Sequence, residues 1–219
     1  MSGRMIITIS RQFGSGGRNI GERIAKKRGI PFYDNELIIE GAKESGVDPE
    51  MVKSLEETPT KAMLYALSGG GGGSFFGGFS PVIDMPITDK LFVAQSEVIR
   101  RLATEAEKGC VIVGRAADYV LRDDPDTLNI FIHRDFDERV NQVAKRYDLT
   151  RKKAHDRVKK IDKQRAGYYS YYADKRWGQV DNYDLCLNSG ILGEDGCVAV
   201  IDATIDNMLL RRKARRKNG

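Results

Sequence analysis

Short apolar runs alternate with longer amphipathic stretches along most of the chain. Five runs have the length of buried strands: residues 6–9, 32–34, 110–113, 128–132 and 183–187. Four stretches have a helical spacing of apolar residues: residues 17–28, 88–107, 135–174 (with Gly167 as an interruption) and 194–215. This alternation predicts an α/β fold, a three-layer parallel sheet with helices on both faces.

The middle of the chain departs from this alternation. Residues 35–67 have helical character in two pieces, and residues 68–81 (SGGGGGSFFGGFSP) form a glycine-rich break. Phenylalanines on this glycine tether favour a flap with apolar contacts, the alternative being plain disorder. We therefore expect a core made of residues 1–40 and 96–219, with a helical, glycine-rich lobe inserted at residues 41–95.

The composition is that of a soluble globular protein with an anionic partner. The 219 residues are 41% hydrophobic and 31% charged, and no run approaches the roughly 20 apolar residues of a membrane span. Cys110, Cys186 and Cys197 lie in apolar runs without paired spacing, which predicts reduced core thiols and a cytoplasmic protein. A net charge of +5 and a pI near 9.0 favour phosphate-bearing small molecules or nucleic acid as partners.

The segment TISRQFGSGGRNIGERIA, residues 8–25, combines a strand end, a glycine cluster and the start of a helix. Backbone N–H groups in such a loop and the helix N-terminus bind phosphate, and glycines let the backbone approach an anion closely. The pattern G-x-x-x-x-G-K-[ST] is nevertheless incomplete, because Gly17 and Arg18 follow Gly16 where Lys and Ser or Thr are expected.

Two arginines can replace the missing lysine. Arg18 begins the predicted helix and Arg11 lies in the loop, and a guanidinium can bridge two phosphate oxygens. A solvent-facing role is the alternative for either side chain. The predicted phosphate-binding set is Arg11, Gly14, Ser15, Gly16, Gly17, Arg18 and Asn19.

Four segments of the chain resemble a known family. They are the first loop and three later segments, VIVGRAADYVL, DKQRAGYYSYYADKRWG and NYDLCLNSG. Together they resemble the bacterial cytidylate kinase-like family of nucleoside monophosphate kinases, P-loop proteins, over nearly the whole chain but weakly between residues 41 and 95. The resemblance implies ATP with Mg²⁺ as the donor. An ungapped alignment sets the kinase lysine against Gly17 and the magnesium-binding threonine against Asn19, with Ser10 and Ser15 as alternatives; there is no direct metal motif.

The resemblance also implies an acceptor site. Arg115 matches the arginine of the family's Gly-Arg-Asp motif, which binds the acceptor phosphate. Ala116 replaces the aspartate that recognises the cytosine nucleotide, so CMP is not implied, although Asp118 is a potential substitute. Asp34 matches an aspartate at the entrance of the acceptor region, and a helix N-cap is its equal alternative.

A lid is expected at about residues 145–178. Asp162 and Arg165, in DKQR, resemble the lid motif that contacts ribose and phosphates. Several aromatic residues follow, and we expect them to pack against the core in preference to stacking on bases: Tyr168, Tyr169, Tyr171, Tyr172 and Trp177.

The leading hypothesis is ATP-dependent phosphoryl transfer to a nucleoside monophosphate or a related phosphorylated small molecule, with Arg18, Arg115 and Arg165 as catalytic residues. Asp34, Arg115, Asp162 and Arg165 are the predicted acceptor-binding residues. One alternative is a catalytically silent nucleotide-binding regulator, because the loop lysine is absent. Another is an RNA-associated protein that uses the basic C-terminus LLRRKARRKNG, although nucleic acid is the less favoured partner. No membrane partner is expected, and a homodimer is compatible with the sequence.

Overall fold

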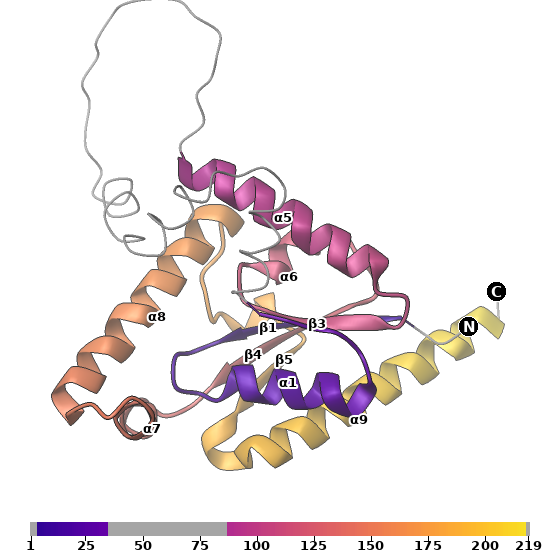
Figure 1. Ribbon diagram of the computed structural model, residues 1–219. Helices are drawn as coiled ribbons and strands as arrows, with labels where there is room; N and C mark the ends of the chain where they lie inside the picture. The colour runs from indigo at the N-terminus through magenta and orange to yellow at the C-terminus, as the bar shows by residue number, and fades with distance from the viewer. Residues whose placement is uncertain (1–3, 35–86, 218–219) are drawn as a thin grey trace, which may run out of the picture.

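The computed structural model describes residues 4–34 and 87–217 and contains one parallel sheet between two layers of helices (Figure 1). The strand order is β2-β3-β1-β4-β5, and every pair of neighbours is parallel. The strands are β1 (Met5–Arg11), β2 (Phe32–Tyr33), β3 (Gly109–Val113), β4 (Thr127–His133) and β5 (Leu185–Asn188). The predicted sheet is therefore confirmed. The helices expected within residues 35–67, the flap at residues 68–81 and most of the inserted lobe lie outside the described residues.

Helices cover both faces of this sheet. The elements are α1 (Gly17–Arg28), α5 (Ile87–Glu105), α6 (Ala117–Val120), α7 (Phe136–Arg146), α8 (Arg151–Ala173), the 3₁₀ helix η1 (Val180–Asn182) and α9 (Ser189–Lys217). In Figure 1, α1 and α9 lie on one face of the sheet, and α5 and α6 on the other. None of the helices within the described ranges is both long enough and apolar enough to cross a membrane.

The central strand β1 contributes to the core on both faces. Its alternate side chains point in opposite directions, so Ile7 and Ile9 join the core cluster of Ile201 in α9, whereas Ile6 joins that of Ile99 in α5. All five side chains are almost fully buried. Burial of each is worth about 1.5–3 kcal/mol relative to exposure, and burial on both faces explains why this strand is apolar without interruption from residue 5 to 7.

The helix interruption predicted at Gly167 is wrong. α8 continues through this residue, and the chain turns instead between α7 and α8, where Asp148 has a φ of 50°. Thr150 then caps α8 by accepting a hydrogen bond from the Lys153 N–H at 3.4 Å. A glycine inside a helix costs only about 1 kcal/mol relative to alanine, and the buried packing of Tyr169 in the same turn offsets that cost.

All three cysteines are free thiols. Cys110 and Cys197 are buried in the core clusters on opposite faces of the sheet, and Cys186 is half-buried. Burial raises the pKa of the Cys110 thiol to about 12, which makes it unreactive near neutral pH. Among the described residues no group of three or more His, Cys, Asp or Glu side chains could hold a metal ion. Cys110 and Cys197 therefore act as small core residues, as predicted, whereas Cys186 is only partly buried.

Asp202 joins α9 to the last turn of α1. Its carboxylate pairs with Arg28 and lies 2.7 Å from the Lys27 Nζ. Burial opposes ionisation of Asp202, but hydrogen bonds from Lys27 and Arg28 outweigh it and lower the pKa of this carboxyl. The stabilisation is thus present above the unfolded pKa of about 3.9 and is lost as the pH falls through the folded value.

We expect Asp202→Asn to lower the free energy of unfolding by about 0.5–1 kcal/mol at pH 7. The difference from wild type should shrink as the pH is lowered from 5 to 3, because wild-type Asp202 then becomes neutral as well. Urea denaturation at each pH measures this, with the more exposed Asp206→Asn as the control. A difference that does not change with pH would contradict the prediction.

Candidate functional site

The candidate site lies at the carboxyl end of β1, where a glycine loop leads into α1. Gly14 and Gly16 have φ values of 81° and 80°, a left-handed conformation that glycine adopts without steric cost. Gly16 is the N-cap of α1 and provides no side chain to cap the first turn. The backbone N–H groups and the positive end of the helix dipole are thereby offered to an anion.

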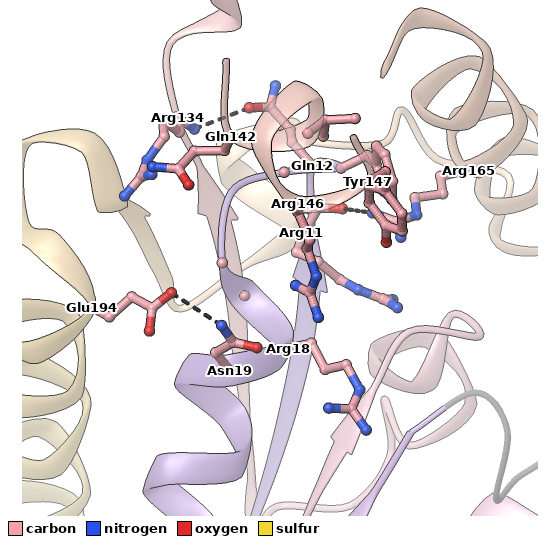
Figure 2. A pocket seen from close by; sticks show the side chains of 15 residues that line it. Arg11, Gln12, Arg18, Asn19, Arg134, Gln142, Arg146, Tyr147, Arg165 and Glu194 are labelled. Atoms are coloured by element: carbon pink, nitrogen blue, oxygen red, sulfur yellow. Dashed lines mark hydrogen bonds between the residues drawn. The ribbon is translucent and has the colours of Figure 1, made fainter. Parts of the chain in front are cut away.

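A cleft with a volume of about 260 Å³ opens over this loop (Figure 2). Its walls come from the loop, the end of β4, α7, α8 and the start of α9. The lining residues are Arg11, Gln12, Phe13, Gly14, Gly16, Gly17, Arg18, Asn19, Arg134, Gln142, Val143, Arg146, Tyr147, Arg165 and Glu194. Five of these are arginines and one is a carboxylate, so the lining carries an excess of positive charge that suits a polyanion.

Arg11, the last residue of β1, lies between the loop and the end of β3. A Cβ atom added at Gly17 would lie 2.6 Å from the Arg11 Cβ, and one added at Gly114 would lie 2.1 Å from the Arg11 Nη1. Burial, followed by the charges of Arg165 and Arg115, holds the pKa of the Arg11 guanidinium well below its usual value. Arg11 therefore belongs to a group of mutually repelling cations that an anion would stabilise.

Arg18 reaches a different part of the site. Its Nη2 lies 2.7 Å from the Asp34 Oδ2, its Nε donates to the same oxygen at 2.9 Å, and its Nη1 lies 3.2 Å from the Glu22 Oε2. In Figure 2 its side chain extends away from Glu194. Although Arg18 lines the cleft, its guanidinium joins α1 to the end of β2, and Arg11 is packed more tightly against the loop.

α7 and α8 hold the loop backbone. Arg165 donates from Nη1 to the Arg11 carbonyl oxygen at 2.8 Å, and the Phe13 N–H donates to the Asp162 Oδ1 at 2.8 Å. The Arg139 Nη1 donates to the Phe13 carbonyl oxygen at 3.1 Å and to the Asp162 Oδ2 at 2.6 Å. The two predicted lid residues are thus both brought to the loop, Arg165 in the cleft lining and Asp162 on the loop backbone.

The candidate magnesium donors are placed differently from one another. Ser15 is fully buried, its hydroxyl donates to the Gln12 carbonyl oxygen at 2.9 Å, and its carbonyl oxygen accepts from Ser189. Asn19 lines the cleft and donates from Nδ2 to the Glu194 Oε1 at 3.3 Å (Figure 2). Glu194 was not among the predicted site residues, although it follows the last strand and therefore reaches the same edge of the sheet.

Arg115 lies in a strained turn after β3. Gly114, Arg115 and Ala116 have φ values of 88°, 55° and 50°, and each non-glycine residue in this region costs of order 1–2 kcal/mol. The Arg115 guanidinium lies 5.7 Å from the centre of the Tyr168 ring. Its charge also contributes to the lowered pKa of Arg11, although Arg115 is not part of the cleft lining.

Asp118, the potential substitute for the missing motif aspartate, is held inside the core. Its carboxyl is buried and accepts a hydrogen bond from the Tyr169 hydroxyl at 2.6 Å. Burial raises the pKa of Asp118, and the Tyr169 hydrogen bond offsets this only in part. Ala116 packs in the same cluster with Tyr169 and Ala173. The aromatic face of α8 therefore packs against α6 and the residue before it, as expected for an aromatic helix face that contributes to the core.

Tyr169→Phe is expected to lower the free energy of unfolding by about 1–2 kcal/mol, because Asp118 loses its buried donor. The loss should grow as the pH rises from 4.5 to 7. A raised folded pKa means that the folded state keeps its proton longer than the unfolded state, so stability falls across this window, and removal of the donor raises that pKa further. Urea denaturation at both pH values measures the effect, with the exposed Tyr171→Phe as control. Equal losses at both pH values would contradict this account.

Comparisons with known proteins place this chain in a family. Residues 6–191 match the Cytidylate kinase-like family. The cytidylate kinase of Methanopyrus kandleri is 26% identical over 217 residues, which cover 94% of this chain and 96% of that protein. An uncharacterized protein from Eubacterium ventriosum has a similar crystal structure, with a TM-score of 0.70, 28% identity and coverage of 93% of this chain and 99% of that one.

The fold is also shared with more distant kinases. A gluconokinase from Sinorhizobium meliloti has a TM-score of 0.55 at 14% identity, over 96% of this chain and 99% of that chain. This likeness concerns the fold alone. The five-stranded parallel sheet, with its glycine loop between β1 and α1, is that of P-loop kinases, and the chain belongs to the cytidylate kinase-like family.

Proposed function

We propose that this protein transfers the γ-phosphoryl group of ATP to a nucleoside monophosphate or a related phosphorylated small molecule. Family membership supports a phosphotransferase, and the cytidylate kinase relatives support a nucleotide as acceptor. The observation that carries the proposal is the loop at the start of α1, whose backbone faces a cleft with five arginines and one carboxylate. A nucleoside triphosphate has the charge and the size that such a cleft accommodates.

The donor phosphates would bind to the loop. Gly14, Gly16 and Gly17 allow the backbone to approach them, and Arg11 and Arg165 neutralise their charge from β1 and α8. The acceptor would bind beyond β3, beside Arg115. A phosphate oxygen is already a nucleophile, so in-line approach and neutralisation of charge provide the catalysis and no general base is required.

The side chains of the cleft fit a magnesium ion carried by the nucleotide. Mg²⁺ prefers oxygen ligands and is held by one or two protein groups together with water and phosphate oxygens. Asn19 and Glu194 offer an amide and a carboxylate side by side in the cleft, whereas the Ser15 hydroxyl is engaged with Gln12. Asn19 and Glu194 would therefore hold the ion, which supplies neutralisation of the phosphate charge when bound.

A phosphoryl-transfer screen tests this proposal. The purified protein is incubated with Mg²⁺ and γ-labelled ATP against all nucleoside monophosphates, then nucleosides and sugar phosphates, and labelled products are separated and identified. We expect label on one class of phosphorylated acceptor, in amounts equal to the ADP formed, and none when EDTA removes the metal. Absence of transfer to every acceptor would refute the proposed activity.

A catalytically silent nucleotide-binding protein is the second candidate. It is favoured by the absence of a lysine at Gly17 and by the ion pair that engages Arg18 with Asp34. Thermal stabilisation by ATP without product in the same screen would support it. A cytoplasmic location, homodimer formation and RNA binding through the C-terminus stay predictions.

A further inference from the structure

Two positions of the loop are exchanged relative to the lysine-bearing pattern G-x-x-x-x-G-K. The first glycine of that pattern corresponds to Arg11, which is separated by four residues from Gly16. The lysine corresponds to Gly17. A cation thus stands where a glycine is expected, and a glycine where the cation is expected.

The structure shows why the two changes belong together. A Cβ atom at Gly17 would lie 2.6 Å from the Cβ and 3.0 Å from the Cγ of Arg11, and 3.3 Å from the Cβ of Ile132 on β4. Carbon atoms that are not bonded do not approach as closely as 2.6 Å without displacement of the backbone. The loop in this conformation therefore accommodates a side chain at residue 11 or at residue 17, but not at both.

The guanidinium of Arg11 extends from the loop toward β3. It reaches Gly114, whose N–H donates to the Ile9 carbonyl oxygen at 3.1 Å, so the ends of β1 and β3 lie side by side. Arg115 follows Gly114, and Arg165 holds the Arg11 carbonyl oxygen from the other side. This position lies between the loop for the donor phosphates and the strand end for the acceptor.

No carboxylate forms an ion pair with Arg11 among residues 4–34 and 87–217. Asp34, the acid that acts on its charge, pairs with Arg18, and Arg165 and Arg115 add positive charge. Glu194, the carboxylate of the cleft, instead accepts from Asn19. Within the described part of the chain, no ion pair thus balances the charge of Arg11.

We propose that Arg11 provides, from the end of the strand, the cation that a lysine provides from the start of the helix in lysine-bearing loops. Its guanidinium binds the phosphate in transfer, and residues 17 and 114 are glycines because the Arg11 side chain needs their space. As the bond from the γ-phosphorus to the bridging oxygen breaks and the bond to the acceptor oxygen forms, the electron pair stays on ADP. Arg11 keeps its proton throughout. The inference rests on the proposed function.

Four variants test this role: Arg11→Met, Arg11→Gly, Gly17→Lys and the double variant Arg11→Gly/Gly17→Lys, which recreates the lysine-bearing pattern. ADP affinity is measured by isothermal titration calorimetry, transfer by the screen's best acceptor, and folding by thermal unfolding. Arg11→Met should weaken ADP binding about 10-fold or more and slow transfer about 10²-fold. Gly17→Lys alone should lose ADP affinity and transfer activity, because the lysine side chain is crowded by Arg11. The double variant should bind ADP more tightly and transfer faster than either single variant. The exposed Arg151→Met is the control and should match wild type.

The outcomes separate this inference from the proposed function. Wild-type protein that binds no ADP would overturn both. Binding and transfer by Arg11→Met within twofold of wild type, or a double variant no better than Arg11→Gly, would overturn the role of Arg11 alone. If Arg11→Met does not fold, Arg11→Lys and Arg11→Gln replace it: a charged variant that binds ADP no better than the neutral one also overturns the inference.

Discussion

Arg165→Ala is expected to slow phosphoryl transfer about 10²–10³-fold, the cost of removing one group that stabilises charge in the transition state. Arg165 lines the cleft and also binds the Arg11 carbonyl oxygen at 2.8 Å, so its loss removes a cation and a contact between α8 and the loop. In the proposed lid role, loosening of α8 admits water, which then competes with the acceptor. Release of inorganic phosphate from ATP should therefore rise while transfer falls.

Lys163→Ala is the matched control for Arg165→Ala. Lys163 is a cation two residues earlier in α8, but it is exposed to solvent. Transfer and phosphate release can be followed in one reaction with γ-labelled ATP and the acceptor found in the screen. We expect Lys163→Ala to match wild type in both. Unchanged transfer and hydrolysis in Arg165→Ala would exclude the lid role.

Asp162→Ala is expected to lower the free energy of unfolding by about 3 kcal/mol, because it leaves a buried charge without its partner. Arg139 is only 4% exposed, and its Nη1 lies 2.6 Å from the Asp162 Oδ2. The same substitution removes the acceptor of the Phe13 N–H. The loop should thus lose one of its two attachments to α8, the other being the hydrogen bond from Arg165, and ADP affinity should fall together with stability.

The exposed pair between Asp137 and Arg151 provides the comparison for Asp162→Ala. It also joins α7 to α8 with a nitrogen–oxygen distance of 2.6 Å, but its side chains are 69% and 61% exposed. Asp137→Ala should therefore cost only about 0.5 kcal/mol. Urea denaturation of both variants at pH 7 measures the two losses. Equal losses would show that burial of Arg139 does not determine the effect.

The sheet and the loop were predictable from the sequence because they depend on local patterns. The apolar strand β1, the glycines at residues 14, 16 and 17, and the helix that follows have signals within a few residues. Because parallel strands end at one edge of the sheet, the end of β3 was also expected beside the loop, and Gly114 lies there next to Arg11.

Contacts between distant elements were not predictable in this way. The pairing of Arg18 with Asp34 depends on the position of β2, and the packing of Arg11 against Gly17 depends on how the loop turns back over the strand. Arg139 had no local signal at all, since its role becomes visible only when α7 packs on the loop. Spacing along the chain predicts which residue types lie near a site, but it does not predict which side chains form ion pairs with one another.

The close approach of residues 11 and 17 restricts how such a loop can evolve. An ancestor with glycine at residue 11 and lysine at residue 17 cannot reach the present loop by single substitutions without a costly intermediate. If residue 11 changes first, two side chains compete for one space; if residue 17 changes first, the loop loses the cation proposed to bind the phosphate in transfer. With the role proposed for Arg11, a fitness valley separates the two forms, and a lineage that has crossed it is expected to keep its arginine.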